Sequence, residues 1–298
     1  MGHSHEHNNM ETLRTKCAKA MEVTFYLTVA FLVAEIVGGF WTKSLALLAD
    51  AGHMLGDAAA LGLALIAIRF AKRASSPEKT YGYYRSEILA AFLNCLFLLL
   101  MSCFILYEAV GRLWKPQEIM SGPMVIIAVL GLIVNLIGIG LLTRVSGNSL
   151  NVKAAYFEVL SDLLGSIAVI VAGVVIGFTN WYWIDPVISG IIGVFILPRT
   201  WLLLRECVHI LMQGTPERIK VQALESEILQ ITGVLGIHSI HVWTLTQGHD
   251  VLSCHILGLP DQNVDVLRSS IQSVLHDKFD IDNSTIQIEF AKCEQAAA

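Results

Sequence analysis

The chain has 298 residues, of which 54% are hydrophobic and 15% are charged, and its formal net charge is −5. This composition is too apolar for an ordinary soluble domain and predicts a membrane protein. The net negative charge and the scattered basic residues argue against nucleic acid as a partner.

The apolar residues are concentrated in about the first two thirds of the chain. We therefore predict a polar tail over 1–20, a transmembrane domain over 21–207, and a domain of ordinary soluble composition over 208–298. The tail carries His3, His5 and His7, an alternation that can capture metal weakly. The alternative is a flexible tail with incidental histidines.

Six apolar segments follow the tail, each long enough to cross a bilayer as a helix. They are Val23–Trp41, Ser44–Phe70, Ile88–Leu113, Met124–Leu142, Ala154–Phe178 and Ile184–Leu204. Short connections favour a compact six-helix bundle. Most Lys and Arg residues lie in the tail and in every second connection, so the positive-inside rule places both termini in the cytoplasm. The predicted location is the inner, or cell, membrane, with several crossings.

Ionisable residues interrupt the second segment at Asp50, His53 and Asp57. At 3.6 residues per turn these positions share one helical face. The fifth segment repeats the pattern with Glu158 and Asp162, again four residues apart. Ionisable side chains at membrane depth are costly and usually mark an ion path.

If the two helices face each other, they offer one imidazole and several carboxylates, a donor set suited to a tetrahedral Zn²⁺ site. The alternative is a polar core in which these side chains satisfy one another without an ion. Close carboxylates repel unless a cation or protons neutralise them, which favours the metal site. Gly38, Gly39 and the small residues of the second and fifth segments permit the close approach of helices that such a site needs.

The remaining 90 or so residues alternate between helical and strand periodicity. Helices are predicted at Pro216–Ile231 and Val264–Phe279, and strands at Ile237–Thr246, Val251–Leu259 and Thr285–Phe290. The order α-β-β-α-β predicts a small three-stranded sheet covered by two helices. The complete fold class is thus an α-helical membrane bundle with a small α+β domain.

His238, His241, His255 and Glu289 lie on or beside these strands. A hairpin can bring His241 and His255 to adjacent strands, with Glu289 joining them from the third, so this group is a second candidate metal site. Polar side chains on strands also serve as solvated faces, and that alternative remains open.

Four sequence runs together resemble the cation diffusion facilitator family, whose bacterial cobalt/zinc/cadmium-resistance branch is the most similar. They are SLALLADAGHMLGD at 44–57, TYGYYRSEILA at 80–90, YFEVLSDLLG at 156–165 and HSIHVWTL at 238–245. The resemblance covers nearly the whole chain.

The resemblance implies a homodimer in the lipid bilayer that exports divalent metal in exchange for protons. It implies transport ligands at His53, Asp57, Glu158 and Asp162, with Asp50 near the entrance or beside the direct ligands. It also implies that 208–298 is a cytoplasmic metal-binding and dimerisation domain, with metal positions at His241, His255 and Glu289 and His238 as a neighbouring candidate.

This sequence departs from the family pattern at one position that affects which ion is transported. Many zinc-selective members have histidine where this chain has Glu158. A carboxylate makes the site harder and more negative, which keeps Cd²⁺ and Co²⁺ as candidate cargo beside Zn²⁺. The connections Arg69–Ser86 and Arg144–Lys153 lack the histidines of many relatives, and no metal site is predicted in either.

The predicted function is proton-coupled efflux of Zn²⁺ from the cytoplasm by alternating access, without enzymatic activity. Zn²⁺ is the transported substrate and a candidate regulatory ion, and protons are the coupling ion. Two alternatives come from other classes: a membrane-tethered metal sensor and an intramembrane zinc metalloenzyme. Against the metalloenzyme, the sequence contains no HExxH motif. Against the sensor, a membrane anchor would not need charged pairs on two separate helices.

Overall fold

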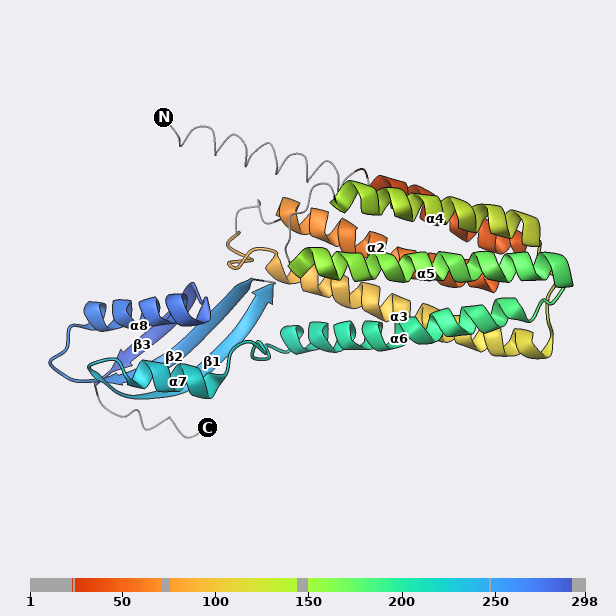
Figure 1. Cartoon of the computed structure of the whole chain (residues 1–298). Coiled ribbons are helices and arrows are strands. Elements are labelled where there is room, and N and C mark those ends of the chain that lie inside the picture. The colour runs from red at the N-terminus through yellow and green to blue at the C-terminus, as the bar shows by residue number, and fades with distance from the viewer. Residues whose placement is uncertain (1–22, 24, 71–75, 144–149, 247, 291–298) are drawn as a thin grey trace, which may run out of the picture. The chain divides into compact units, whose positions relative to one another are not determined.

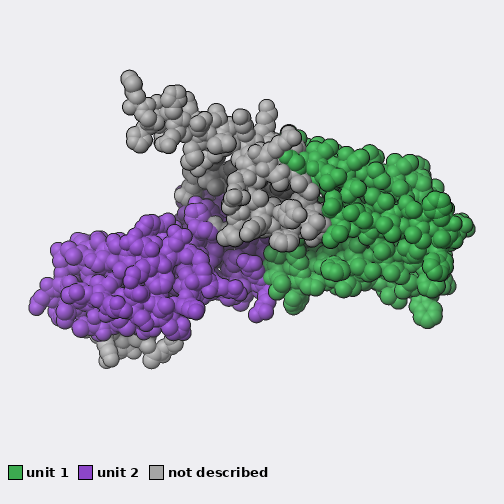
Figure 2. Space-filling view, viewed as in Figure 1, with its two compact units in different colours: residues 1–66, 93–204 green, residues 67–92, 205–298 purple. Residues whose placement is uncertain are grey.

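A computed structural model describes residues 23, 25–70, 76–143, 150–246 and 248–290. Within these ranges, the side chains of 57, 60, 61, 63–70, 139, 141–143 and 150–162 lie outside the description. Contacts divide the chain into two compact units, which Figure 2 colours separately. Unit 1 comprises 1–66 and 93–204, and unit 2 comprises 67–92 and 205–298.

Long helices account for most of the chain up to residue 211, as the red to green ribbons of Figure 1 show. A first helix covers Phe25–Thr42, and the labelled helices are α2 (Leu45–Phe70), α3 (Tyr84–Trp114), α4 (Ser121–Thr143), α5 (Leu150–Thr179) and α6 (Ile184–Leu211). The six predicted helices are thereby confirmed. Several of them extend beyond the apolar run that predicted them.

Helix α2 has buried apolar partners on three sides, so it lies at the centre of unit 1. One cluster joins it to α4 and α5 through Ala46, Leu47, Met124, Ala128, Val169, Ala172 and Ile176. A second joins it to the first helix through Phe31, Leu32, Ala51, Met54 and Ala58. A third joins it to α3 through Leu45, Ala49, Ile105 and Ala109, with Ile192 of α6 packed against them.

Within the described part of the chain, four helices are long and apolar enough to cross a membrane: Phe25–Thr42, α3, Ser121–Gly138 of α4, and α6. Among the described residues of α2 and α5, the apolar stretches are the shorter Leu45–Gly56 and Leu163–Thr179. Large side chains such as Phe178 and Phe195 are 87% and 78% exposed. An apolar exterior on an apolar bundle suits lipid rather than water, which agrees with the predicted membrane domain.

Unit 2 contains the predicted α-β-β-α-β domain, which is confirmed. Its elements are α7 (Val221–Leu229), β1 (Val234–Thr246), β2 (His249–Gly258), α8 (Val264–Phe279) and β3 (Asn283–Glu289). The sheet order is β1-β2-β3, with β1 antiparallel and β3 parallel to β2. Helix α7 begins five residues later than predicted, at Val221.

The two faces of this sheet have different side chains because successive residues of a strand point to opposite sides. Leu252, Cys254 and Ile256 of β2 are buried in one core with apolar side chains of α7 and α8. Ser253 and His255 alternate with them and therefore lie on the opposite face. Both helices thus pack on one face, and the candidate metal-binding side chain His255 belongs to the other.

The first turns of α3 belong to unit 2 through contacts with the turn between β1 and β2. Thr246 Oγ1 donates a hydrogen bond to the Glu87 carboxylate. The Tyr84 ring lies 5.0 Å from the His249 imidazole, centroid to centroid. This grouping of residues 67–92 with the C-terminal domain was not predicted from the sequence.

Candidate functional site

A cavity of about 380 Å³ lies in unit 1 among α2, α3, α5 and α6. Its polar lining includes Asp50 and His53 of α2, Asn94 of α3, and Arg199 and Thr200 of α6. Most of the remaining wall is apolar, for example Leu98 and Phe195. An imidazole and a carboxylate in a mostly apolar cavity are the kind of donors that hold a divalent cation.

Asp50 is fixed in this cavity by close contact with α5. It is 3% exposed, and Ser166 Oγ donates a hydrogen bond of 3.4 Å to its Oδ2. A Cβ atom on Gly165 would lie only 2.9 Å from Asp50 Oδ1, so the missing side chain is what admits the carboxylate. The family resemblance implied a position for Asp50 near the entrance or beside the direct ligands, and in the structure Asp50 is buried against α5.

The other predicted transport ligands are Asp57, Glu158 and Asp162, whose side chains lie outside the described residues. Their backbone positions are helical: Asp57 follows His53 by one turn in α2, and Glu158 and Asp162 lie in α5. Leu164 and Gly165, just after Asp162 in the chain, line the cavity. His3, His5 and His7 also lie outside the described residues.

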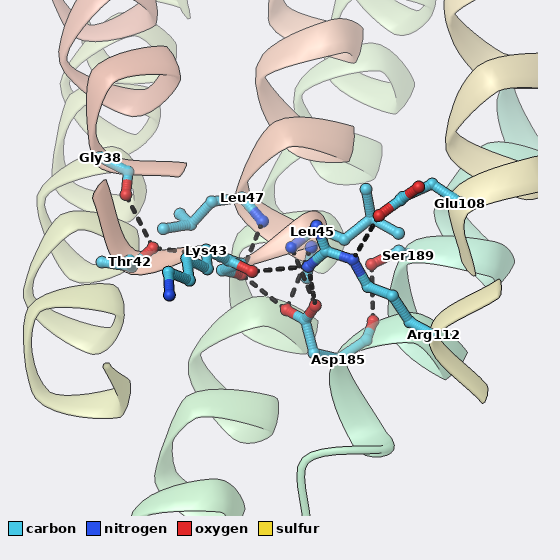
Figure 3. A network of polar contacts seen from close by, with 11 residues as sticks. Gly38, Thr42, Lys43, Leu45, Leu47, Glu108, Arg112, Asp185 and Ser189 are labelled. Atoms are coloured by element: carbon cyan, nitrogen blue, oxygen red, sulfur yellow. Dashed lines mark hydrogen bonds and ion pairs between the residues drawn. The ribbon is translucent and has the colours of Figure 1, made fainter. Parts of the chain in front are cut away.

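At its first residues, α2 is capped by a carboxylate from another helix. Asp185 of α6 accepts hydrogen bonds from Ser44 Oγ (2.6 Å), the Leu45 amide (2.8 Å) and the Ala46 amide (3.1 Å). Ser44 Oγ in turn accepts from the Leu47 amide at 3.2 Å. The first amides of a helix have no partner within it, and a negative charge there is favourable. Figure 3 shows this arrangement, which we call the interhelical cap.

Arg112 of α3 joins the interhelical cap from a third helix. Its Nη1 donates to the Lys43 carbonyl at 2.6 Å and lies 3.9 Å from Asp185 Oδ2. Its Nε donates to Glu108 Oε1 at 3.0 Å. Lys43 has a positive φ of 61°, and Figure 3 shows its carbonyl turned towards Arg112. The start of α2 is therefore tied to both α3 and α6.

Neither Asp185 nor Arg112 was identified as a site residue from the sequence. A local signal existed, because Ser44 precedes an apolar run as helix N-caps do. Its partner Asp185 is 141 positions away in the chain. Helical periodicity alone could not pair the two.

In unit 2, the structure brings His238, His255 and Glu289 together. One donor atom from each lies within 4.8 Å of the others, and the two imidazole rings are 5.0 Å apart. The side chains of His238 and His255 are 26% and 34% exposed, and that of Glu289 is 10% exposed. Two imidazole nitrogens and a carboxylate oxygen are donors that Zn²⁺ accepts, with room in a tetrahedron for one more ligand.

Sheet register explains why these three residues meet. His238 of β1 lies directly opposite His255 of β2, and Glu289 lies in β3 opposite Leu257, two residues further along β2. His241 lies opposite Ser253, so three steps along β1 correspond to two along β2. A bulge absorbs the extra residue, and Ser239 has a φ of 51° there.

His241 consequently lies on the same sheet face as His238, about 7 Å further along the strand. It is exposed and outside the group of three. The sequence analysis had placed His241 among the metal positions with His238 as its neighbour. The structure instead groups His238 with His255 and Glu289.

Glu289 interacts with both histidines. His238 Nε2 lies 3.2 Å from Glu289 Oε2, and His255 Nδ1 lies 2.8 Å from Oε1. Burial raises the pKa of the Glu289 carboxyl, but the hydrogen bond from His238 and the charge of His255 outweigh burial and lower that pKa below its usual value. His255 Nδ1 is not aligned for a hydrogen bond and, buried, has no hydrogen-bond partner. A nitrogen lone pair in that position fits a metal ligand.

Two family models together match nearly the whole chain. Residues 22–212 match the cation efflux transmembrane domain, and residues 216–291 match the cation efflux protein cytoplasmic domain. The chain belongs to the cation diffusion facilitator family. The family predicted from the four sequence runs is thereby confirmed.

Full-length relatives agree with the two family models. The metal cation efflux system protein CzcD of Cupriavidus metallidurans is 45% identical over 298 residues, 100% of this chain and 92% of that protein. The zinc transporter ZitB of Pectobacterium atrosepticum is 40% identical over 296 residues, 99% of this chain and 91% of that protein. A cadmium, cobalt and zinc/H⁺–K⁺ antiporter of Bacillus velezensis is 37% identical, with 98% and 93% covered.

Among solved structures, the metal-bound C-terminal domain of the CzcD transporter from Cupriavidus metallidurans is 33% identical to this chain. The match covers 24% of this chain and 99% of that domain, with a TM-score of 0.23. The family models and the full-length relatives show that this chain is a membrane transporter for metal cation efflux and not an enzyme. The zinc metalloenzyme alternative is excluded by its family.

Proposed function

We propose that this cation diffusion facilitator exports Zn²⁺ from the cytoplasm in exchange for protons, by alternating access. The observation that supports the proposal most is the cavity among α2, α3, α5 and α6 that contains both Asp50 and His53. The transport ligands are His53, Asp57, Glu158 and Asp162. Asp50, buried against Gly165 and Ser166, adds negative charge beside them and holds α2 close to α5.

Coupling to protons follows from the chemistry of the donors. Imidazole and carboxylate groups bind metal only when deprotonated, so protons and Zn²⁺ compete for one site. Metal enters from the cytoplasm and displaces protons. After the bundle reorients, protons arriving from the other side displace the metal. No separate proton path is required, because the same side chains bind Zn²⁺ and protons alternately.

The identity of the cargo rests on the donor set. One imidazole with three carboxylates suits Zn²⁺, and the carboxylate of Glu158 also keeps Cd²⁺ and Co²⁺ as cargo. Relatives carry names that include zinc, cadmium and cobalt. Arg199 lines the same cavity, and its positive charge disfavours a metal cation there once the carboxylates are protonated.

We propose an orientation with both termini in the cytoplasm of a cell-membrane protein, as the distribution of Lys and Arg predicts. The ends of the helices at Ser44, Arg112 and Asp185 then face the outside. The cytoplasmic domain matches a family model whose short name refers to dimerisation, which supports a homodimer. Metal at His238, His255 and Glu289 regulates transport in this proposal.

The decisive experiment measures proton movement in proteoliposomes that contain a pH dye, with Zn²⁺, Cd²⁺, Co²⁺ or Mn²⁺ added in turn. We expect Zn²⁺ to drive a proton flux in the wild type and none in Asp57→Ala. Glu118→Ala is the matched control, because it also replaces an acid by alanine but lies in an exposed connection outside the cavity. Its flux should equal that of the wild type.

Two results would contradict the proposal. Wild-type flux in folded Asp57→Ala would remove Asp57 from the transport site. Absence of flux with every ion, in protein that is folded and still binds Zn²⁺, would favour the membrane-tethered metal sensor. The ranking of the ions would report how the carboxylate at Glu158 affects selectivity.

A further inference from the structure

The interhelical cap contains more hydrogen-bonding side chains than are needed to cap the start of α2. Ser44 alone already caps α2, since its hydroxyl accepts from the Leu47 amide. Asp185 adds a complete second cap from α6, and it is fully buried, as is Ser44. A buried carboxylate is costly, so this one is retained for what it connects rather than for the helix end itself.

The cap lies beyond one end of the cavity. Within α6, the cavity lining begins at Ile191 and continues to Leu203. Ile191 lies six residues, or about 9 Å, beyond Asp185 along the helix. The cluster of Leu45, Ala49, Ile105 and Ala109 packs α2 against α3 beside the cap, and no described residue of the cap lines the cavity. Hence the cavity extends away from the cap, and these buried apolar side chains lie between the two.

We propose that Asp185 is a positioning residue that acts as a latch: it holds the first residues of α2 against α6 and keeps the outer end of the transport cavity closed. This inference rests on the proposed function, because it assigns the cap to the step in which metal leaves. For Zn²⁺ to leave through the outer end, the start of α2 separates from Asp185.

The hydrogen-bond geometry makes this latch two-state. Both Asp185 oxygens contact α2: Oδ1 accepts from Ser44 and Ala46, and Oδ2 accepts from Leu45. A small rigid shift of α2 lengthens all three bonds together. The amides and the carboxylate then need water as their new partner, which only an open outer end supplies. The three hydrogen bonds of Asp185 are therefore either all formed, with water excluded, or all broken, with water bound to the separated groups.

Arg112 strengthens the closed state from α3. It holds the Lys43 carbonyl immediately before α2 and lies 3.9 Å from Asp185 Oδ2. Removing Arg112 leaves the direct bonds of Asp185 to α2 in place. Its loss should therefore weaken the latch less than loss of the carboxylate.

Cys95 offers a native reporter for the test. It lines the cavity and is 5% exposed, so its rate of modification reports access to the cavity. In a protein with Cys95 as its one cysteine, the rate of modification by a charged, membrane-impermeant methanethiosulfonate is measured without metal. Right-side-out vesicles report access from outside, and everted vesicles report access from the cytoplasm. Transport is not needed for this readout.

In the Cys95 protein we expect slow modification from outside and faster modification from the cytoplasm. Asp185→Asn and Asp185→Ala should raise the outside rate at least about ten-fold, and Arg112→Gln by less. Ser189→Ala is the matched control: Ser189 is buried one turn along α6 and donates to the Asp185 carbonyl, within its own helix. Its outside rate should not change.

An unchanged outside rate in both folded Asp185 variants would overturn the proposal, whether or not the protein transports Zn²⁺. Conversely, a raised rate in a protein that drives no proton flux would keep the latch and reject antiport. A second variant tests closure directly, with cysteines at Ser44 and Asp185 in a protein otherwise free of cysteine. Oxidation should stop transport and reduction should restore it. Equal transport in the oxidised and reduced protein would overturn the latch.

Discussion

Unit 1 and unit 2 hold their polar side chains in different surroundings. Asp50 and Asp185 of unit 1 are 3% and 0% exposed, and both accept hydrogen bonds from neighbouring helices. In unit 2, the His238 and His255 side chains are about a quarter to a third exposed. Glu289 bridges them, and one buried nitrogen of His255 has no hydrogen-bond partner.

The difference separates two ways of handling a cation. Donors in a dry bundle bind and release an ion only when the helices around them move or protons replace it. Donors at a half-exposed sheet face exchange an ion with the cytoplasm directly. We therefore expect changes in unit 1 to alter the rate of transport, and changes at the sheet to alter metal affinity and its regulatory effect.

The largest effect should follow from His53→Gln. His53 is the described imidazole of the cavity, and its loss removes the one nitrogen donor of the proposed transport site. Zn²⁺-driven proton flux should fall by about 100-fold, as expected when a metal ligand is lost. Proteoliposome flux measures this change.

His209→Gln is the control for His53→Gln. The His209 ring interacts with the Thr215 carbonyl at 2.9 Å, outside the cavity lining. It should retain wild-type flux. If proton flux fell equally in both variants, the cavity histidine would have no special role in transport.

Gly165→Ala should have the next largest effect. The added Cβ would lie 2.9 Å from Asp50 Oδ1, so the buried carboxylate must move away from α5. We expect transport to fall about ten-fold while the protein stays folded, because the displaced atom belongs to one side chain and not to backbone. Flux and size-exclusion chromatography together separate the two effects.

Gly190→Ala provides the comparison for that result. It also adds a methyl group within a helix, but nothing lies within 4 Å of the new atom. Replacing a helical glycine by alanine without a clash is neutral or stabilising by about 0.5–1 kcal/mol. Unchanged transport in Gly165→Ala would show that the approach of Asp50 to α5 does not matter for function.

Glu289→Gln should change metal binding without abolishing transport. The titration is done on the full chain carrying Asp57→Ala, so that the sheet group is the main remaining site. Zn²⁺ affinity should fall about ten-fold or more, since the carboxylate is one of three donors. A competing chromophoric chelator reports the affinity.

His241→Ala is the matched change on the same sheet face. His241 lies outside the group of three, so its replacement should leave Zn²⁺ affinity nearly unchanged. If His241→Ala weakened binding as much as Glu289→Gln, the ligand set implied by the family resemblance would hold and the geometric grouping would be wrong.

Helical and strand periodicity predicted most of this fold. Each long helix was predicted from one run of apolar residues, and β1, β2 and β3 were predicted from the alternation of apolar and polar residues. The spacing of Asp50 and His53 likewise follows from 3.6 residues per turn, and both line the cavity. These features are local, so a single sequence reveals them.

What could not be predicted depends on contacts between distant segments. Nothing near Ser44 indicates that Asp185 will cap α2, because the pairing arises only when α6 packs beside it. Similarly, strict alternation would place His238 and His241 on opposite faces of β1. The bulge at Ser239 returns them to one face, and a bulge has no reliable signature in one sequence.

The smallest predicted effect concerns His276, at the end of α8. Its Nδ1 lies 2.7 Å from Asp282 Oδ1, and the hydrogen bond and the charge of Asp282 raise the pKa of His276 above its ordinary value. A raised pKa in the folded state means that the pair contributes its full stability below about pH 6.5, and loses it as the pH rises through the folded pKa. His276→Gln should therefore matter more at pH 6 than at pH 9.

Amide hydrogen exchange over 264–289, compared with the wild type at the same pH, measures this difference. We expect exchange about two-fold faster in His276→Gln at pH 6 and equal exchange at pH 9, since an exposed pair contributes little. Asp282→Asn should behave in the same way, because it removes the other partner. An equal increase at both pH values would mean that His276 acts through packing and not through its charge. His276 lies in α8, which packs on the sheet face opposite His255, and it is outside the group of His238, His255 and Glu289. Neither variant should therefore alter Zn²⁺ affinity, which separates stability of the sheet domain from metal binding.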